Sequence, residues 1–270
     1  MNRFSLKNKN VVITGGLGML GIQHAFAVSE SSGFPILLDL DASKYENARC
    51  ELASINHAFI CADITNKKTM SSVLSQIKVE YGAVDVLINN AALNPKFDKI
   101  TNCGASSRFE NYSIDLFHLE LNVGLTGALI CSQIFGTEMA KNAGGVILNI
   151  SSDLGIIAPD QRLYSDVSKS AHEQSVKPVS YSIIKHGLIG LTRYIATYWT
   201  RDNVRCNALL PGGVYENQSD EFVGKLTNLI PMGRMANKDE YRGAIQFLIS
   251  DASKYMNGSL LVMDGGRTCW

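Results

Sequence analysis

The chain has 270 residues, of which 46% are hydrophobic and 19% charged, a composition typical of a globular protein. Its 25 Lys and Arg balance its 25 Asp and Glu, which argues against a broad surface for nucleic acid. Its six cysteines lack metal-binding or disulfide spacing, its apolar runs are too short to span a membrane, and its N-terminal stretch lacks a signal-peptide segment. We therefore expect a cytoplasmic protein with no metal site and no nucleic-acid or membrane partner.

Short apolar runs alternate with longer helical patterns along the whole chain. The predicted strands are residues 11–14, 35–40, 58–62, 84–89, 145–151, 204–210 and 259–263. Helical patterns lie between them, for example in residues 69–81 and 182–200. Several strands are apolar throughout, as expected when both faces of a parallel sheet are covered. We predict an α/β fold, with a single domain over residues 1–270 and a parallel sheet of about seven strands flanked by helices on both sides.

The first predicted strand runs into residues 14–21, a stretch that contains four glycines. Gly16-x-Gly18-x-x-Gly21, between a strand and a helical pattern, fits the fingerprint of a dinucleotide-binding turn. Glycine permits a tight turn and lets backbone N–H groups approach a pyrophosphate closely, while the following helix N-terminus supplies partial positive charge. The stretch therefore predicts a dinucleotide site.

Asp39 ends the second predicted strand, 18 residues after Gly21. A carboxylate at this position can accept hydrogen bonds from both ribose hydroxyls of an adenosine and would repel a 2′-phosphate. No Lys or Arg lies in the glycine loop or directly after Asp39. We therefore predict NAD(H) rather than NADP(H). Asp41 is a nearby competitor, and we prefer Asp39 because it lies closer to the strand end.

Several further segments, in chain order, resemble the short-chain dehydrogenase/reductase family. They are Asn89-Asn90-Ala91-Ala92, Asn149-Ile150-Ser151-Ser152, Tyr181-Ser182-Ile183-Ile184-Lys185, Asn207-Ala208-Leu209-Leu210-Pro211-Gly212 and Asp264-Gly265-Gly266. This resemblance covers nearly the whole chain and implies a doubly wound Rossmann-type domain, a nicotinamide cofactor, a small-molecule substrate and a homodimer or homotetramer. Met19 departs from the pattern, because the compact branch of the family usually has glycine there. The spacing instead looks like that of the extended branch, so we expect a compact-type protein with a variant glycine loop.

The resemblance also implies which residues contact the cofactor. An aspartate after the third strand, here Asp63, lies beside the adenine in the family. The expected cofactor-binding residues are Gly15, Gly18, Leu20, Asp39, Asp63, Ile64, Asn90, Ala91, Tyr181, Lys185, Pro211, Gly212 and Val214.

The expected catalytic residues lie on one helix and on the segments before it. Tyr181 and Lys185 are four positions apart, which places them on one helix face. By resemblance, Tyr181 is the general acid/base, and Lys185 lowers its pKa and binds the nicotinamide ribose. Ser152 hydrogen-bonds the same substrate oxygen, and Asn122 supports a water chain from Lys185. Ser151 is the alternative to Ser152, which we favour because it lies closer to the strand end.

A second tyrosine competes with Tyr181 for the catalytic role. Tyr164 lies 12 residues after Ser152, nearer the gap familiar in the family, but Lys169 is five residues further on and turns off its helix face. Tyr181 instead lies 29 residues after Ser152. Residues 155–177 are therefore expected to be an insertion, either a solvated surface loop or a wall of the substrate site.

Two polar segments bear on the substrate. Residues 94–112, which carry Lys96 and Arg108, and residues 213–229 should border the substrate pocket, although ordinary solvated surface explains each of them equally well. We predict an NAD(H)-dependent oxidoreductase that interconverts a secondary alcohol and a carbonyl on a sugar-like or polyol-like substrate. The alternatives are a nucleotide-sugar epimerase or dehydratase that uses NAD transiently, and a non-catalytic NAD-binding protein.

Overall fold

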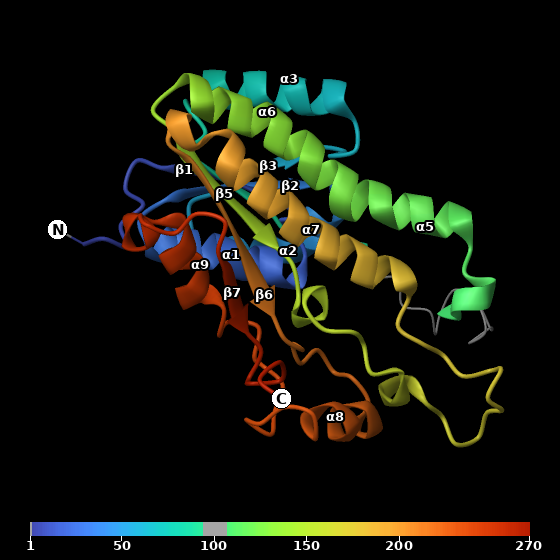
Figure 1. The fold of residues 1–270 in the computed structure, drawn as a ribbon. Coiled ribbons are helices and arrows are strands. Elements are labelled where there is room, and N and C mark those ends of the chain that lie inside the picture. The colour runs from blue at the N-terminus through green and yellow to red at the C-terminus, as the bar shows by residue number, and fades with distance from the viewer. Residues whose placement is uncertain (1, 94–106) are drawn as a thin grey trace.

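The computed structural model describes residues 2–93 and 107–270. Within these residues the chain forms a parallel sheet of seven strands in the order β3-β2-β1-β4-β5-β6-β7 (Figure 1). The strands are β1 (Asn10–Thr14), β2 (Phe34–Asp39), β3 (Ala58–Cys61), β4 (Val86–Asn89), β5 (Gly145–Ile150), β6 (Val204–Pro211) and β7 (Leu260–Met263). Every predicted strand is confirmed, with ends that shift by at most two residues, and so is the doubly wound fold.

The strand order reverses between β1 and β4, because the chain first winds outward to β3 and then returns to build the other half of the sheet. Ile13 of β1 pairs with both Leu37 of β2 and Ile88 of β4, so these residues lie side by side in the three strands. Parallel strands all present their carboxyl ends to the same edge. In open sheets of this kind, ligands bind in the crevice beyond that edge, at the reversal point.

Helices cover both faces of the sheet, as the apolar strands require. Val11, Val12 and Ile13 of β1 are fully buried, and successive side chains point to opposite faces. One face carries α1 (Met19–Glu30), α2 (Ser43–Leu52) and α9 (Arg242–Ile249), and the other carries α3 (Lys67–Glu80), α6 (Gly127–Lys141) and α7 (Val179–Tyr198) (Figure 1). The two main hydrophobic cores therefore lie on opposite sides of the sheet.

The predicted helical patterns at residues 69–81 and 182–200 correspond to α3 and α7. Asn66 caps α3, since its side-chain oxygen accepts hydrogen bonds from the N–H groups of Lys68 and Thr69. Pro178 stands at the N-cap of α7, directly before the helix that carries the expected catalytic pair.

One long helix joins α5 (Ile114–Leu121) to α6 through a π-helical turn at Asn122–Thr126. By length and composition alone, Ile114–Lys141 could cross a membrane. Phe135 and Met139 of α6 are fully buried, and α6 packs against β4, β5 and α3. This packing identifies α6 as a core helix of the doubly wound domain.

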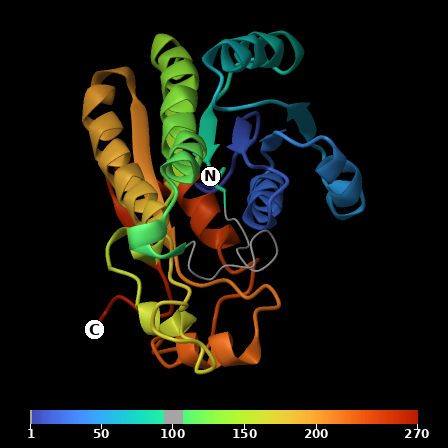
Figure 2. The ribbon, with the colours of Figure 1, turned by 90° about the vertical axis from the view of Figure 1, so that its right-hand side faces the viewer.

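Residues 155–177, between β5 and α7, lie beside α8 (Asp220–Thr227) and below the sheet in the two ribbon views (Figures 1 and 2). Leu163 is buried here with Leu226, Ile230 and Met235 in a small separate core. The segment and α8 thus form one packed unit next to the carboxyl ends of the strands.

Candidate active site

The glycine loop after β1 leaves no room for side chains at two positions. Gly15 has a φ of +60°, and a Cβ atom there would lie 2.8 Å from Cα of Ala91. A Cβ atom on Gly21 would lie 2.2 Å from the carbonyl oxygen of Gly15. The loop leads into α1 at Gly18, which has no side chain to cap the helix. The first-turn N–H groups of α1 thus suit an anionic group such as a pyrophosphate.

Asn90 and Ala91, which follow β4, form hydrogen bonds with this loop. The side-chain amide of Asn90 donates to the carbonyl oxygens of Thr14 (3.1 Å) and Gly15 (3.0 Å). In return, the hydroxyl of Thr14 accepts from the N–H groups of Asn90 (3.0 Å) and Ala91 (3.1 Å). We call residues 14–21 together with Asn90 and Ala91 the cofactor cradle.

Asp39 lies against the cradle, whereas Asp41 does not. The Asp39 carboxylate accepts from the N–H of Leu17 (3.1 Å) and of Leu40 (2.9 Å). The Asp41 carboxylate instead accepts the hydroxyl of Ser43 at 2.6 Å in an exposed turn. Of the two, Asp39 is thus the carboxylate placed next to the glycine loop.

The other expected cofactor residues sit at the same edge of the sheet. Asp63 follows β3 and accepts hydrogen bonds from the hydroxyl and the N–H of Thr65. Ile64 is buried against Gly127, so closely that a Cβ atom on Gly127 would clash with its side chain. Pro211 ends β6, and a Cβ on Gly212 would lie 2.8 Å from Cα of Asp264. The remaining two are Leu20, in the first turn of α1, and Val214, which forms a β-bridge with Ala236. The cradle and these neighbours therefore fit a dinucleotide.

Tyr181, Lys185 and Ser152 come together near the carboxyl end of β5. The Lys185 ammonium lies 5.6 Å from the ring centre of Tyr181 and donates to the carbonyl oxygen of Ile150 at 2.9 Å. Burial raises the pKa of Tyr181, and a hydrogen bond with Ser152 lowers it. Burial, with the nearby charge of Lys177, lowers the pKa of Lys185 to about 8. Both shifts favour the neutral forms, because burial disfavours the charged form of each group.

Ser152 and Ser151 have different partners. The hydroxyl of Ser151 donates to the carbonyl oxygen of Lys185 at 2.7 Å and so holds α7 against β5. The hydroxyl of Ser152 donates to Asp153 at 2.7 Å, and its oxygen accepts from the N–H of Leu154 at 3.2 Å. Only Ser152 of the two contacts the Tyr181 phenol.

The side chain of Asn122 lies apart from those of the other expected catalytic residues. Asn122 is exposed and borders a separate hollow with His118 and Thr126, away from the Tyr181 cavity. Gly124, two residues later, lines the Tyr181 cavity instead. The physical cause is the π turn that begins at Asn122, where the N–H of Gly127 bonds back to the Asn122 carbonyl and shifts the helical phase.

A cavity of about 200 Å³ lies against the first turns of α7. Its charged and phenolic side chains come from α7 and from segments distant in sequence. They are Tyr181 and Lys185 from α7, Lys177 and Tyr164 from the preceding segment, and Glu120 from α5. Tyr164 therefore shares the cavity with Tyr181, although its expected partner Lys169 is exposed and approaches Asp166.

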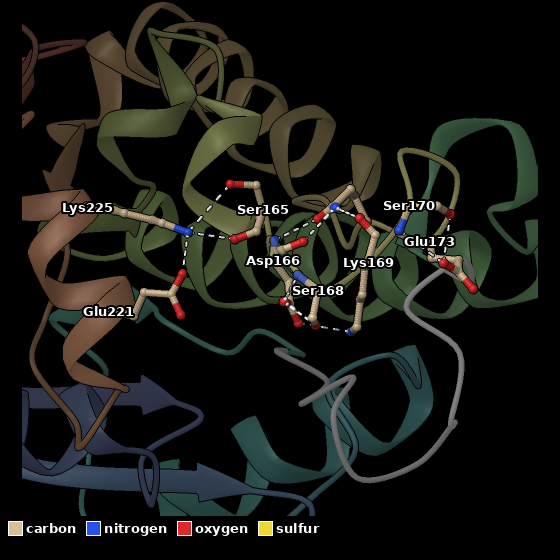
Figure 3. A network of polar contacts seen from close by, with 9 residues as sticks. Ser165, Asp166, Ser168, Lys169, Ser170, Glu173, Glu221 and Lys225 are labelled. Carbon is tan, nitrogen blue, oxygen red and sulfur yellow. Dashed lines mark hydrogen bonds and ion pairs between the residues drawn. The ribbon is translucent and has the colours of Figure 1, made fainter.

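Residues 155–177 form a wall of this cavity rather than a free loop. Ser175, Val176 and Lys177 line it, and the N–H of Val176 donates to Ser107 at 3.0 Å. At the other end, Lys225 of α8 donates to the carbonyl oxygen of Ser165 at 2.6 Å (Figure 3). We call residues 155–177 together with Glu120 the substrate wall. Of the earlier polar loop, residues 94–106 and thus Lys96 lie outside the described residues, and Arg108 donates to the carbonyl of Ala171 at 2.8 Å.

The sequence reasoning missed three groups at this site. Lys177 precedes Tyr181 by four residues and Lys185 by eight, a spacing that could have indicated that the three side chains lie close together. Glu120 is an isolated carboxylate among the apolar residues of α5, and it accepts a hydrogen bond from the buried hydroxyl of Tyr112. The third group is the ion pair of Asp153 with Arg267, 2.8 Å apart and nearly fully buried, for which no sequence signal stands out.

Comparison with known proteins agrees with this geometry. Residues 9–177 match the short chain dehydrogenase family, and residues 178–268 match a family described as enoyl-(acyl carrier protein) reductase. The chain is 28% identical over 273 residues to an NAD-dependent glycerol dehydrogenase of Listeria innocua, with 98% of this chain and 96% of that protein covered.

Two solved structures are also similar. A short chain dehydrogenase from Leptospira borgpetersenii with bound NAD+ has a TM-score of 0.82 at 29% identity, with 98% and 94% of the chains covered. A gluconate 5-dehydrogenase from Burkholderia cenocepacia, in complex with NADP and tartrate, has a TM-score of 0.84 at 23% identity, with 100% and 98% covered, and so shares the fold. With family matches along nearly its whole length, this chain belongs to the short-chain dehydrogenase/reductase family of oxidoreductases.

Proposed function

We propose that the protein is an NAD(H)-dependent oxidoreductase that interconverts a secondary alcohol and a carbonyl, with Tyr181 as general acid/base. The main support is the clustering of Tyr181, Ser152 and Lys185 beside a cavity, at the sheet edge that also carries the cofactor cradle. A protein that only bound the dinucleotide would have no need of the serine–tyrosine contact.

Each residue has a distinct part in the proposed chemistry. The nicotinamide, when bound, accepts or donates the hydride. The Tyr181 hydroxyl lies at the cavity and exchanges a proton with the substrate oxygen. The Lys185 ammonium, 5.6 Å from the ring centre of Tyr181, favours the phenolate form. The Ser152 hydroxyl, which donates to Asp153 in this structure, rotates to hydrogen-bond the substrate oxygen when substrate binds. The proposed water chain from Lys185 past Asn122 to solvent stays a prediction, and the Asn122 side chain is exposed.

Asp39 supports NAD(H) over NADP(H), because its carboxylate lies against the glycine loop where it would repel a 2′-phosphate. Polar groups on the cavity wall, including Glu120, Ser175 and Ser180, support a hydroxylated substrate. The glycerol dehydrogenase relative acts on a polyol, as its name states, which agrees with a polyol-like substrate for this protein.

We further propose that residues 155–177 are an insertion that shapes substrate choice, and that the protein works as a homodimer or homotetramer in the cytoplasm. Large apolar side chains are exposed on α5, α6 and α7, which lie side by side (Figures 1 and 2). They are Ile114, Leu119, Leu129, Ile183, Tyr194 and Tyr198. Such a patch favours a subunit contact. The described cysteines are free thiols, in keeping with a reducing compartment.

The test is a turnover assay with NAD+ or NADP+ and a panel of glycerol, tetritols, hexitols, sugar acids and apolar secondary alcohols, followed by absorbance of the reduced cofactor. We expect net accumulation of NADH with at least one hydroxylated substrate. Turnover of apolar alcohols alone would contradict the substrate class. Epimerisation of a nucleotide sugar without net NADH would contradict the reaction.

A further inference from the structure

Lys177 places a second ammonium at the catalytic phenol. Its Nζ atom lies 3.9 Å from the ring centre of Tyr181, closer than that of Lys185 at 5.6 Å. The lysine is half-buried and lines the same cavity. Its contact with the phenol ring is a cation–π interaction, which provides no oxygen or nitrogen acceptor for the N–H donors of the ammonium.

The other charged groups at the cavity already have partners. Glu120 accepts from the hydroxyl of Tyr112, and Lys185 donates to the carbonyl oxygen of Ile150. Asp153, which acts on Lys177 at longer range, is held by Arg267 and by Ser152. Among the residues that the structure describes, the Lys177 ammonium has no ion pair and no hydrogen-bond acceptor.

In the part of the chain that the structure describes, the side chains lining the cavity carry an excess of positive charge. Lys177 and Lys185 face one carboxylate, that of Glu120, while the Asp153–Arg267 pair is internally neutral. Burial lowers the pKa of Lys177, so a half-buried ammonium without an acceptor is costly. An anion brought in by a ligand would supply both the missing charge and the missing acceptors.

The backbone around Lys177 is fixed, so the ammonium is presented by an ordered wall. The N–H of Lys177 donates to the side-chain oxygen of Gln161 at 2.8 Å, and the N–H of Val176 donates to Ser107 at 3.0 Å. Pro178 follows directly as the N-cap of α7. Lys177 therefore has a set position relative to the phenol of Tyr181.

We propose that Lys177 is a specificity residue that binds an anionic group, a carboxylate or a phosphate monoester, carried by the substrate close to the alcohol that reacts at Tyr181. The proposal rests on the proposed function and narrows its substrate class from polyols in general to acidic or phosphorylated polyols. Lys185 remains the lysine that acts on the phenol, and Lys177 acts on the substrate.

The experiment measures binding without turnover. The enzyme is saturated with the reduced cofactor it prefers and titrated calorimetrically with D-glucitol, D-gluconate or D-glucitol 6-phosphate, none of which a reduced cofactor can oxidise. The variants are Lys177→Met, which removes the charge, and Lys177→Arg, which keeps it. Lys169→Met is the matched control, because Lys169 belongs to the same segment but is exposed and approaches Asp166.

We expect the wild type and Lys169→Met to bind at least one anionic ligand at least about tenfold more tightly than D-glucitol. Lys177→Met should abolish this preference while leaving D-glucitol affinity within about threefold, and Lys177→Arg should retain most of it. The tighter of the two anionic ligands identifies the carboxylate or the phosphate as the recognised group.

Two results would overturn the proposal: a wild type without preference for either anion, and a Lys177→Met variant that weakens all three ligands equally. The second result would mean that Lys177 acts on the phenol or the fold. Failure of the proposed function is a separate result, namely no cofactor reduction with any alcohol of the panel, and the binding titrations still decide on Lys177 in that case.

Discussion

The cofactor cradle and the substrate wall lie near the same edge of the sheet but are built in different ways. The cradle is formed by closely packed backbone and requires glycine, since a Cβ atom on Gly21 would lie 2.2 Å from the Gly15 carbonyl oxygen. The wall depends on charged side chains, including Lys177 and Glu120, which lie in separate parts of the chain. The cradle can be recognised from one short stretch of sequence, whereas the wall depends on how distant segments pack.

The difference also separates two kinds of function. A backbone cradle binds what all members of a family share, because steric fit to a dinucleotide does not vary with the substrate. Side chains on a wall can change without disturbing the sheet, so they are free to set specificity. Four substitutions test this contrast, two on the substrate side and two on the cofactor side.

The largest effect is expected for Tyr181→Phe. Loss of the hydroxyl removes the proton donor and acceptor, so kcat should fall by at least about 10³-fold while the Kd for NADH changes by less than about threefold. Steady-state kinetics and fluorescence titration measure the two quantities. Tyr164→Phe, which alters the other phenol of the same cavity, should keep kcat within about threefold of wild type. An equal loss in both variants would show that the two tyrosines cannot be told apart by role.

Arg267→Met should destabilise the protein by about 3–5 kcal/mol, because it leaves the buried carboxylate of Asp153 without its counterion. Urea unfolding measures this change. Addition of Asp153→Asn in the same chain should restore most of the stability. Arg162→Met is the control, since its pair with Asp160 involves a largely exposed arginine and should contribute less than about 1 kcal/mol. Similar losses for both arginines would refute the importance of burial.

On the cofactor side, His24 of α1 should make stability depend on pH. Burial lowers its pKa to about 4 from 6.5, so between these values only the unfolded chain takes up the proton. Stability should therefore fall as pH drops from about 6.5, and the full loss of about 3 kcal/mol is reached below about pH 4. His24→Leu should remove this part of the acid sensitivity in urea unfolding at several pH values. His186→Leu, on the exposed side of α7, should leave it unchanged.

The smallest effect is expected for Asp39→Ser. Removal of the carboxylate beside the glycine loop should reduce the preference for NADH over NADPH by about tenfold or more, because a 2′-phosphate is no longer repelled. The ratio of the two dissociation constants measures the change. Asp41→Ser should leave the ratio as it is, because that side chain turns back to Ser43. A shift with Asp41 and not with Asp39 would reverse the assignment.

The strands, and the placement of Tyr181 and Lys185 on one face of α7, could be predicted from sequence because both depend on local patterns. Apolar runs such as residues 11–14 mark strands buried on both faces, and a spacing of four places Tyr181 and Lys185 on one helix face. The order of the strands is not local, and it entered only through the family resemblance. Lys177 also lies four residues before Tyr181, but it precedes the first residue of α7. Outside a helix, a spacing of four residues does not predict that two side chains lie on the same side.

Asn122 shows why the rest could not be predicted. Its role was inferred from the family resemblance alone, and the π turn of Asn122–Thr126 changes the helical phase between α5 and α6. No residue type predicts such a turn. In the structure, Gly124 rather than Asn122 lines the Tyr181 cavity. A pattern that holds within each helix therefore fails across their junction.

The ion pair of Arg267 with Asp153 has a consequence for folding. It joins positions 114 residues apart, and Asp153 in turn orients the hydroxyl of Ser152. Closing so long a loop is slow and entropically costly, and it becomes favourable only when the strands between have already paired. The chain should thus acquire its dinucleotide pocket early and its chemistry late, with catalytic competence appearing as one of the final events of maturation.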